Sequence, residues 1–131
     1  MNYFDKVQNY LLELECEVVG KDEEEQILVI TDQDRGICNM LLDCEGEVLI
    51  MEQHILNIDT KKPESYKRLL QINREIVHGA FVLDEAGDKV IFRDTLQLAN
   101  LDVNELEASL NALALALAEN ADEFLSLAER N

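Results

Sequence analysis

The sequence predicts an α+β fold, with an antiparallel sheet of about five strands and the element order α-β-β-β-α-β-β-α. Three observations support this prediction. Apolar residues recur at helical spacing in three segments, five short apolar runs lie between turn-forming residues, and short turns join consecutive runs, which favours antiparallel pairing. The chain is long enough for one hydrophobic core, so we expect a single domain over residues 1–131.

The first half of the chain should form one helix and three strands. Asn2 can cap a helix that ends near Cys16, and its apolar face would hold Phe4, Val7, Leu11 and Leu14. The charged segment "GKDEEEQ" that follows is typical of a solvated connection or sheet edge. The strands expected next are Ile27 to Thr31, Ile37 to Asp43 and Glu47 to Leu56, joined by the turns "DQDRG" and "CEG".

The second half should add a helix, two strands and a long final helix. Pro63 suits the first position of a helix that continues to Val77. The runs "GAFVLD" and "KVIFRD" are strand-like and are joined by "EAG". Asp102 and Glu105 have the spacing of a capping box, which opens a helix reaching about Arg130.

Within that last helix, the stretch "LALALAE" alternates with a period of two, a pattern typical of strands. Its residues are nevertheless among the best helix formers, and none is β-branched or aromatic. At 100° per residue, the larger apolar side chains form one narrow stripe. The segment is therefore predicted as helix, and the stripe consists of Leu106, Leu110, Leu113, Leu117, Phe124 and Ala128.

Another face of the same helix carries small residues. Ala108, Ala112 and Ala116 would let a second backbone approach closely, and Leu115 lies on the back of the helix. Either the first helix of the same chain packs there and Leu115 is an ordinary exposed leucine, or Leu115, Ala108 and Ala112 form part of a dimer or client contact. The sequence leaves both possibilities open.

The charge of the chain limits its partners. There are 28 acidic and 11 basic residues, a net charge of −17, and such a field repels nucleic acids and anionic lipid. We therefore expect neither a nucleic acid nor a membrane as partner. No apolar run is long enough to span a bilayer, and the N-terminus does not resemble a signal peptide. The three cysteines, without a CxxC pair, favour a reduced, cytoplasmic setting.

The residue types needed for catalysis or metal binding do not occur together. His54 and His78 are far apart and have no metal ligand at suitable spacing. The cysteines Cys16, Cys38 and Cys44 are predicted to be small buried hydrophobes. We therefore predict no enzyme activity, no catalytic residues, no metal and no cofactor. Arg93 and Asp94 could pair with Glu75 or with each other.

Asn73 is the most informative polar residue, because it lies on the apolar face of the second helix with Leu69 and Ile76. A buried amide must find hydrogen-bond partners. We expect it to play a structural role by bonding to a nearby strand or turn backbone, and contact with a ligand is the alternative.

The same helix also carries much of the chain's positive charge. Five of the eleven basic residues fall in this region: Lys61, Lys62, Lys67, Arg68 and Arg74. They form either a solvated face that balances local acids or a docking patch for an acidic partner or a second copy of this chain.

From Arg68 onward the sequence resembles the YbjN-domain family, which is grouped with the CesT/Tir-type chaperones of type III secretion. The matching features are Leu69 and Leu70 with Asn73, then Gly79, the "LDEAG" turn, "LQLANLD", and a long Leu/Ala helix with Phe124 near its end. The resemblance implies a twisted antiparallel sheet with helices packed on it. It also implies a small, acidic, cytoplasmic protein, commonly homodimeric and non-enzymatic, that binds other proteins.

Two functions remain possible from the sequence. The first is a non-catalytic, chaperone-like module that holds a client on an apolar sheet or helix surface. The second is a small regulatory domain, sensory or signalling, that binds a small ligand in a sheet–helix cleft. The runs "ILVI" and "VLIM" are apolar without alternation, so both sheet faces should be covered, one by helices and the other by a dimer mate or client.

Overall fold

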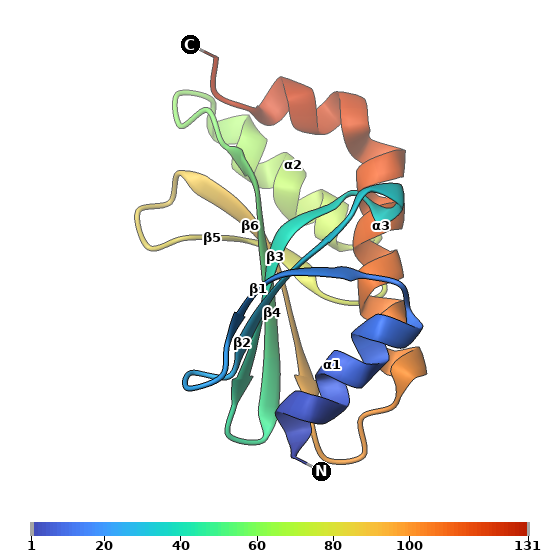
Figure 1. Cartoon of the computed structure of the whole chain (residues 1–131). Helices are drawn as coiled ribbons and strands as arrows, with labels where there is room; N and C mark the ends of the chain where they lie inside the picture. The colour runs from blue at the N-terminus through green and yellow to red at the C-terminus, as the bar shows by residue number, and fades with distance from the viewer. Residues whose placement is uncertain (1, 131) are drawn as a thin grey trace.

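All three α-helices lie on one face of a single antiparallel sheet in the computed structural model, which describes residues 2–130 (Figure 1). The strand order is β1-β2-β3-β4-β6-β5. The elements are α1 (Tyr3–Glu13), β1 (Glu17–Asp22), β2 (Ile27–Asp32), the short 3-10 helix η1 (Gln33–Arg35), β3 (Ile37–Glu45), β4 (Val48–Asn57), α2 (Pro63–Asn73), β5 (Ala80–Leu83), β6 (Lys89–Gln97) and α3 (Val103–Leu127).

The predicted α+β class and antiparallel sheet are confirmed, and the strand count differs slightly from the predicted value of about five. Within the described residues the sheet has six strands, and β1 is the additional one. This strand lies at the edge and pairs only with β2, with an irregular register between Val18 and Gly20. Its last residues belong to the segment that the sequence indicated as a charged connection or sheet edge.

The helix α2 ends at Asn73, well before the predicted Val77. The segment that follows turns back toward the sheet and reaches it at Gly79, which has a φ of +76°. A Cβ at this position would lie 2.6 Å from Cζ of Phe92, so only glycine fits. The chain therefore leaves the helix before Gly79, where the backbone approaches the Phe92 ring closely.

The core lies between the helices and the inner face of the sheet. Most of the predicted stripe on α3 is buried there, whereas Leu117 and Ala128 are half-buried. Ala116, predicted to lie on the small-residue face, is also buried. The inner sheet face contributes the fully or almost fully buried side chains Leu28, Ile30, Met40, Leu42, Leu49, Met51, Val90 and Phe92.

A buried polar contact holds α3 on the sheet. The hydroxyl of Ser109, which has no solvent exposure, donates to Oδ2 of Asp94 at 2.7 Å. The expected pairing of Arg93 with Asp94 or Glu75 is not found, because adjacent strand residues point to opposite faces of the sheet. Arg93 instead pairs with Glu52 on the outer face, at 3.2 Å.

The helix α3 bends near its C-terminal end. Asn120 has non-helical angles, φ −122° and ψ 18°, and its side-chain amide donates to the Ala116 carbonyl at 2.9 Å. Beyond the bend, the chain reaches the junction between β4 and α2, where Ile58 forms a β-bridge with Ala128. The β4–α2 junction and the C-terminal segment therefore meet at this end of the molecule.

Candidate partner-binding surfaces

The side chain of Asn73 joins the end of α2 to the edge of the sheet. Its amide nitrogen donates to the Phe81 carbonyl at 2.9 Å, and the Phe81 N–H donates to Asn73 Oδ1 at 2.8 Å. Phe81 belongs to the edge strand β5, so the amide occupies the side where another strand would pair. Asn73 is half-buried, less enclosed than the sequence indicated.

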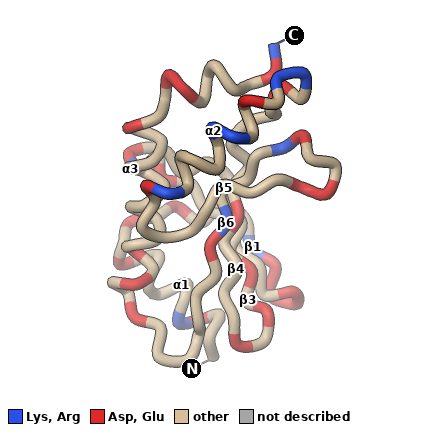
Figure 2. The backbone as a smooth tube through the Cα atoms, turned by 180° about the vertical axis from the view of Figure 1, so that it is seen from behind, with Lys and Arg blue, Asp and Glu red and all other residues tan. Residues whose placement is uncertain are grey.

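The basic residues of α2 have different environments. Figure 2 shows them as blue segments along α2 and at the turn before it. Arg68 makes two contacts with Glu123 of α3, one of them from Nη2 to Oε1 at 2.8 Å, and this hydrogen bonding lowers the pKa of Glu123. Lys67 and Arg74 are exposed and make no ion pair within residues 2–130. They are therefore available to a partner, whereas Arg68 is already engaged.

Two exposed apolar residues lie close to these charges. Leu70 is 72% exposed on α2, and Val77 is 79% exposed just after it. Val77 also lines a small hollow that includes Ala112 and Leu115 of α3. Apolar and basic side chains therefore alternate along this side of the helix layer.

Two of the predicted contact residues of α3, Ala112 and Leu115, lie beside the segment that follows α2. Ala108 and Ala112 are half-buried, and Leu115 is 56% exposed. Glu75, Ile76 and Val77 line the hollow together with Ala112, so this segment approaches the small-residue face there. Leu115 remains open to solvent at the rim.

The outer face of the sheet carries no helix (Figure 1). Strand register places the outward-facing side chains in rows, one of which runs from Val29 through Leu41 to Glu52 and Arg93. A shallow hollow on this face includes Leu41, Glu52 and Ile91. Val48 on this side is 38% exposed, and the other outward-facing apolar residues are half-buried: Ile27, Val29, Leu41, Ile50, Val82 and Ile91.

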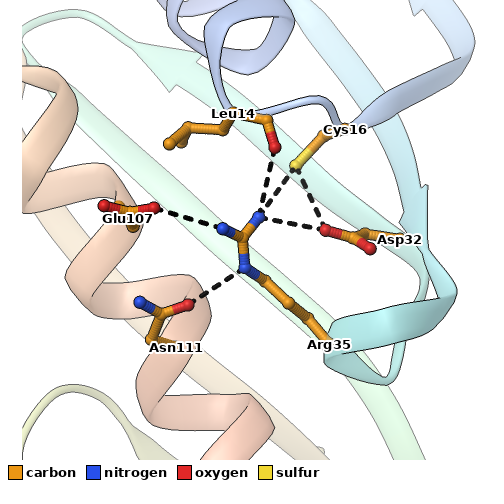
Figure 3. A network of polar contacts seen from close by, with 6 residues as sticks. All are labelled: Leu14, Cys16, Asp32, Arg35, Glu107 and Asn111. Atoms are coloured by element: carbon orange, nitrogen blue, oxygen red, sulfur yellow. Dashed lines mark hydrogen bonds and ion pairs between the residues drawn. The ribbon is translucent and has the colours of Figure 1, made fainter.

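A polar cluster around Arg35 connects four segments of the chain (Figure 3). The guanidinium lies on η1 and donates to the Leu14 carbonyl after α1 and to Asp32 at the end of β2. It also donates to Glu107 and Asn111 of α3, at 3.2 and 3.0 Å. This cluster could not be predicted from the sequence, because "DQDRG" carries only a turn signal and its partners come from distant segments.

The cysteines show no sign of activation. Cys16 is buried beside Arg35, and its pKa is raised mainly by burial and also by Asp32, with Arg35 opposing both. Burial and the charge of Asp43 raise the pKa of Cys44 to about 11. A thiol with a raised pKa is a poor nucleophile near neutral pH. The prediction that Cys38 is buried is wrong, since this residue is exposed.

Neither histidine has neighbours suited to bind a metal. His54 lies on the outer face with Nε2 2.9 Å from Oδ1 of Asn57, and His78 is exposed after α2. Among residues 2–130, no group of three or more His, Cys, Asp or Glu side chains is arranged to hold a metal ion. In the same part of the chain, no helix is both long and apolar enough to cross a membrane.

The arrangement of helices on one sheet face has a counterpart among known proteins. Residues 1–130 match the CesT_Tir_1 family. The chain belongs to this family. The resemblance to YbjN and to type III secretion chaperones is therefore confirmed. No curated protein matches the CesT_Tir_1 chain at a significant level.

Solved structures with this fold include YbjN from E. coli, a proposed transcription regulator, with a TM-score of 0.68, 12% identity and 92% of each chain covered. The Yersinia pestis type III secretion chaperone SycH, solved with a fragment of YscM2, has a TM-score of 0.56 and 17% identity, over 97% of this chain and 100% of the other. ExsC in the ExsC–ExsE complex has a TM-score of 0.65 and 20% identity, over 100% of both chains. At these identities, the likeness establishes the fold of this CesT_Tir_1 member.

Proposed function

We propose that this chain is a non-catalytic, chaperone-like module that holds a segment of a client or partner protein on an apolar surface. The observation that carries the proposal is the outer sheet face, which bears half-buried apolar side chains and has no helix over it. Apolar surface of this kind is typical of interaction sites. SycH and ExsC, which share the fold, were each solved in a complex with another protein.

The proposal contains no catalytic step, in keeping with the chaperones that share the family and fold. It places the protein in the cytoplasm, where its cysteines would stay reduced. The regulatory alternative requires a closed cleft with convergent polar groups. The hollow between β4 and α3 is open and lined mainly by apolar residues, including Ile55, Phe124 and Leu125, so it favours the protein-binding function.

Comparative affinity capture tests the proposal. The tagged chain, a Leu41→Asp variant and a Leu115→Asp variant would be used to capture proteins from a lysate, followed by mass spectrometry. We expect a captured protein to be lost from Leu41→Asp, on the outer face, because a carboxylate there disrupts apolar contact. Circular dichroism would verify that both variants fold. Capture that is no greater than from untagged beads would contradict the proposed function.

We also propose that the chain forms a homodimer. The candidate surface consists of Leu115, Ala108 and Ala112 of α3 with the exposed Lys67 and Arg74 of α2, and Arg68 lies beside them. Two chains of charge −17 repel each other, but salt screens this repulsion beyond roughly 8 Å. Light scattering after size exclusion should therefore show a dimer at ordinary salt that weakens as salt is lowered. A mass near 15 kDa at high protein concentration would contradict the dimer.

A further inference from the structure

An acidic residue lies at the centre of the apolar rows on the outer sheet face. In the register of the sheet, Asp43 of β3 lies between Ile27 of β2 and Ile50 of β4. Leu41, two residues earlier on the same strand, faces the same side. All four residues are half-buried. Apolar side chains therefore flank the carboxylate on both neighbouring strands, and the polar residues Asp22 and Thr95 lie farther along the same row.

One oxygen of this carboxylate has no partner in the folded chain. Asp43 Oδ1 is shielded from solvent and has no hydrogen bond within residues 2–130. Burial raises the pKa of Asp43, as do the hydrogen bond and charge of Glu45 and the charges of Glu25 and Glu52. Buried polar atoms in proteins nearly always have a partner. Among the described residues, Oδ1 of Asp43 thus has no donor, and Glu45 is the side chain that shares a hydrogen bond with this carboxyl group.

The charges around Asp43 determine which donor fits. Glu25 and Glu45 add negative charge near it, and Glu52 is balanced by its ion pair with Arg93. The local field therefore favours a cation. A second copy of the chain is a poor occupant, because a two-fold contact through this face would bring two such acidic groups together.

We propose that the outer sheet face binds a segment of a partner protein in which a lysine or arginine is flanked by apolar residues, with the basic side chain donating to Asp43. This inference rests on the proposed protein-binding function and names the chemistry of the partner. The apolar residues of the segment contact Ile27, Leu41 and Ile50. The cation makes a charge-assisted hydrogen bond that strengthens as the bound segment excludes water.

Three fluorescein-labelled nonapeptides test the chemistry. The first has Val, Lys and Ile at alternate positions with Ser between them. In the second, Glu replaces every Lys, and in the third, Ser replaces Val and Ile while Lys is kept. Fluorescence anisotropy should show that the first binds most tightly. Equal binding of the third would overturn the proposal, because it would mean unspecific attraction to a chain of charge −17.

Two variants with the same change in charge locate the site. Asp43→Asn should weaken binding of the first peptide by about tenfold, the loss expected for one charge-assisted hydrogen bond. Asp122→Asn removes an exposed carboxylate on α3, away from the sheet, and should leave affinity unchanged. Equal weakening by both variants, or amide shift changes confined to α2 and α3 in NMR spectra, would overturn the assignment to the outer face.

The same variants separate this inference from the function on which it rests. A protein captured by the wild-type chain and retained equally by Asp43→Asn would leave the protein-binding function standing and overturn the role of Asp43. Failure of the wild-type chain to capture any protein, in the experiment above, would count against the function itself. Loss of the captured protein from Asp43→Asn but not from Asp122→Asn would support both.

Discussion

The two faces of the sheet carry similar apolar residues that differ in burial. On β2, Leu28 and Ile30 point inward and are fully buried, whereas Ile27 and Val29 point outward and are only half-buried. Antiparallel sheets with one solvated face normally alternate apolar and polar residues. The outer face breaks this rule without a helix to cover it. This difference in burial is what supports the proposed partner-binding role of the outer face.

Matched leucine truncations on the two faces should show the largest difference in stability. Leu28→Ala on the inner face should cost about 2–5 kcal/mol of unfolding free energy, since the fully buried side chain leaves a cavity in the core. Leu41→Ala on the outer face should cost less than about 1 kcal/mol. Urea denaturation measures both. Similar losses would mean that the outer face is as important to folding as the inner one.

Ion pairs on the two sides of the sheet provide a second test. Arg35→Met should cost about 1–3 kcal/mol, because Asp32 and Glu107 would lose a cation that is only 20% exposed. Arg93→Met, which breaks the more exposed pair with Glu52, should cost no more than about 1 kcal/mol. Thermal melting of both variants gives the comparison. A larger loss of stability for Arg93→Met than for Arg35→Met would contradict the expectation that the ion pairs on the helix side stabilise the fold more.

Asn73 tests whether the helix layer is tied to the sheet edge by its amide. Asn73→Leu should cost about 1–3 kcal/mol, because the backbone groups of Phe81 lose their partners. Asn73→Asp keeps an acceptor for the Phe81 N–H, so its melting temperature should fall between those of the wild-type chain and Asn73→Leu. An unchanged melting temperature combined with lost partner capture would instead assign Asn73 to binding.

The smallest expected effect on stability is at Asp43, where a substitution should stabilise the fold instead of destabilising it. The pKa of the Asp43 carboxyl is raised in the folded chain. Such a group reduces stability as the pH rises from its pKa in the unfolded chain to its pKa in the folded chain. Asp43→Asn should therefore stabilise the fold at pH 7, by less than about 1 kcal/mol given solvent screening. The gain should vanish near pH 4, where carboxyls of ordinary pKa become protonated. Melting curves across this range would detect it, and a constant gain would exclude the titration of Asp43 as its cause.

Local sequence patterns predicted the three helices and five of the six strands, because helical spacing and turn residues are local signals. The strand β1 lacks such signals. It lies at the sheet edge, its side chains are mostly exposed, and its register is interrupted between Val18 and Gly20. Nothing in its pattern of apolar and polar residues distinguishes it from a charged loop.

The contacts of the candidate surfaces depend on tertiary structure and were less predictable. The Arg35 cluster assembles from segments that are remote in sequence, so no spacing rule indicates it. Cys38 is exposed because β3 begins irregularly, with Asn39 at a φ of +51°. In contrast, the outer apolar face was visible in the runs "ILVI" and "VLIM", since loss of alternation along a strand is itself a local pattern.

The bridge between Ile58 and Ala128 has a consequence for the order in which the molecule is assembled. Two backbone hydrogen bonds flank it, from Asp59 to Leu127 at 3.0 Å and from Glu129 to Asn57 at 2.7 Å. Together they close a loop that contains α2, β5, β6 and all of α3. Joining the ends of so long a loop costs entropy before any contact compensates for it. We therefore expect the contacts between this junction and the C-terminal segment to form late in folding.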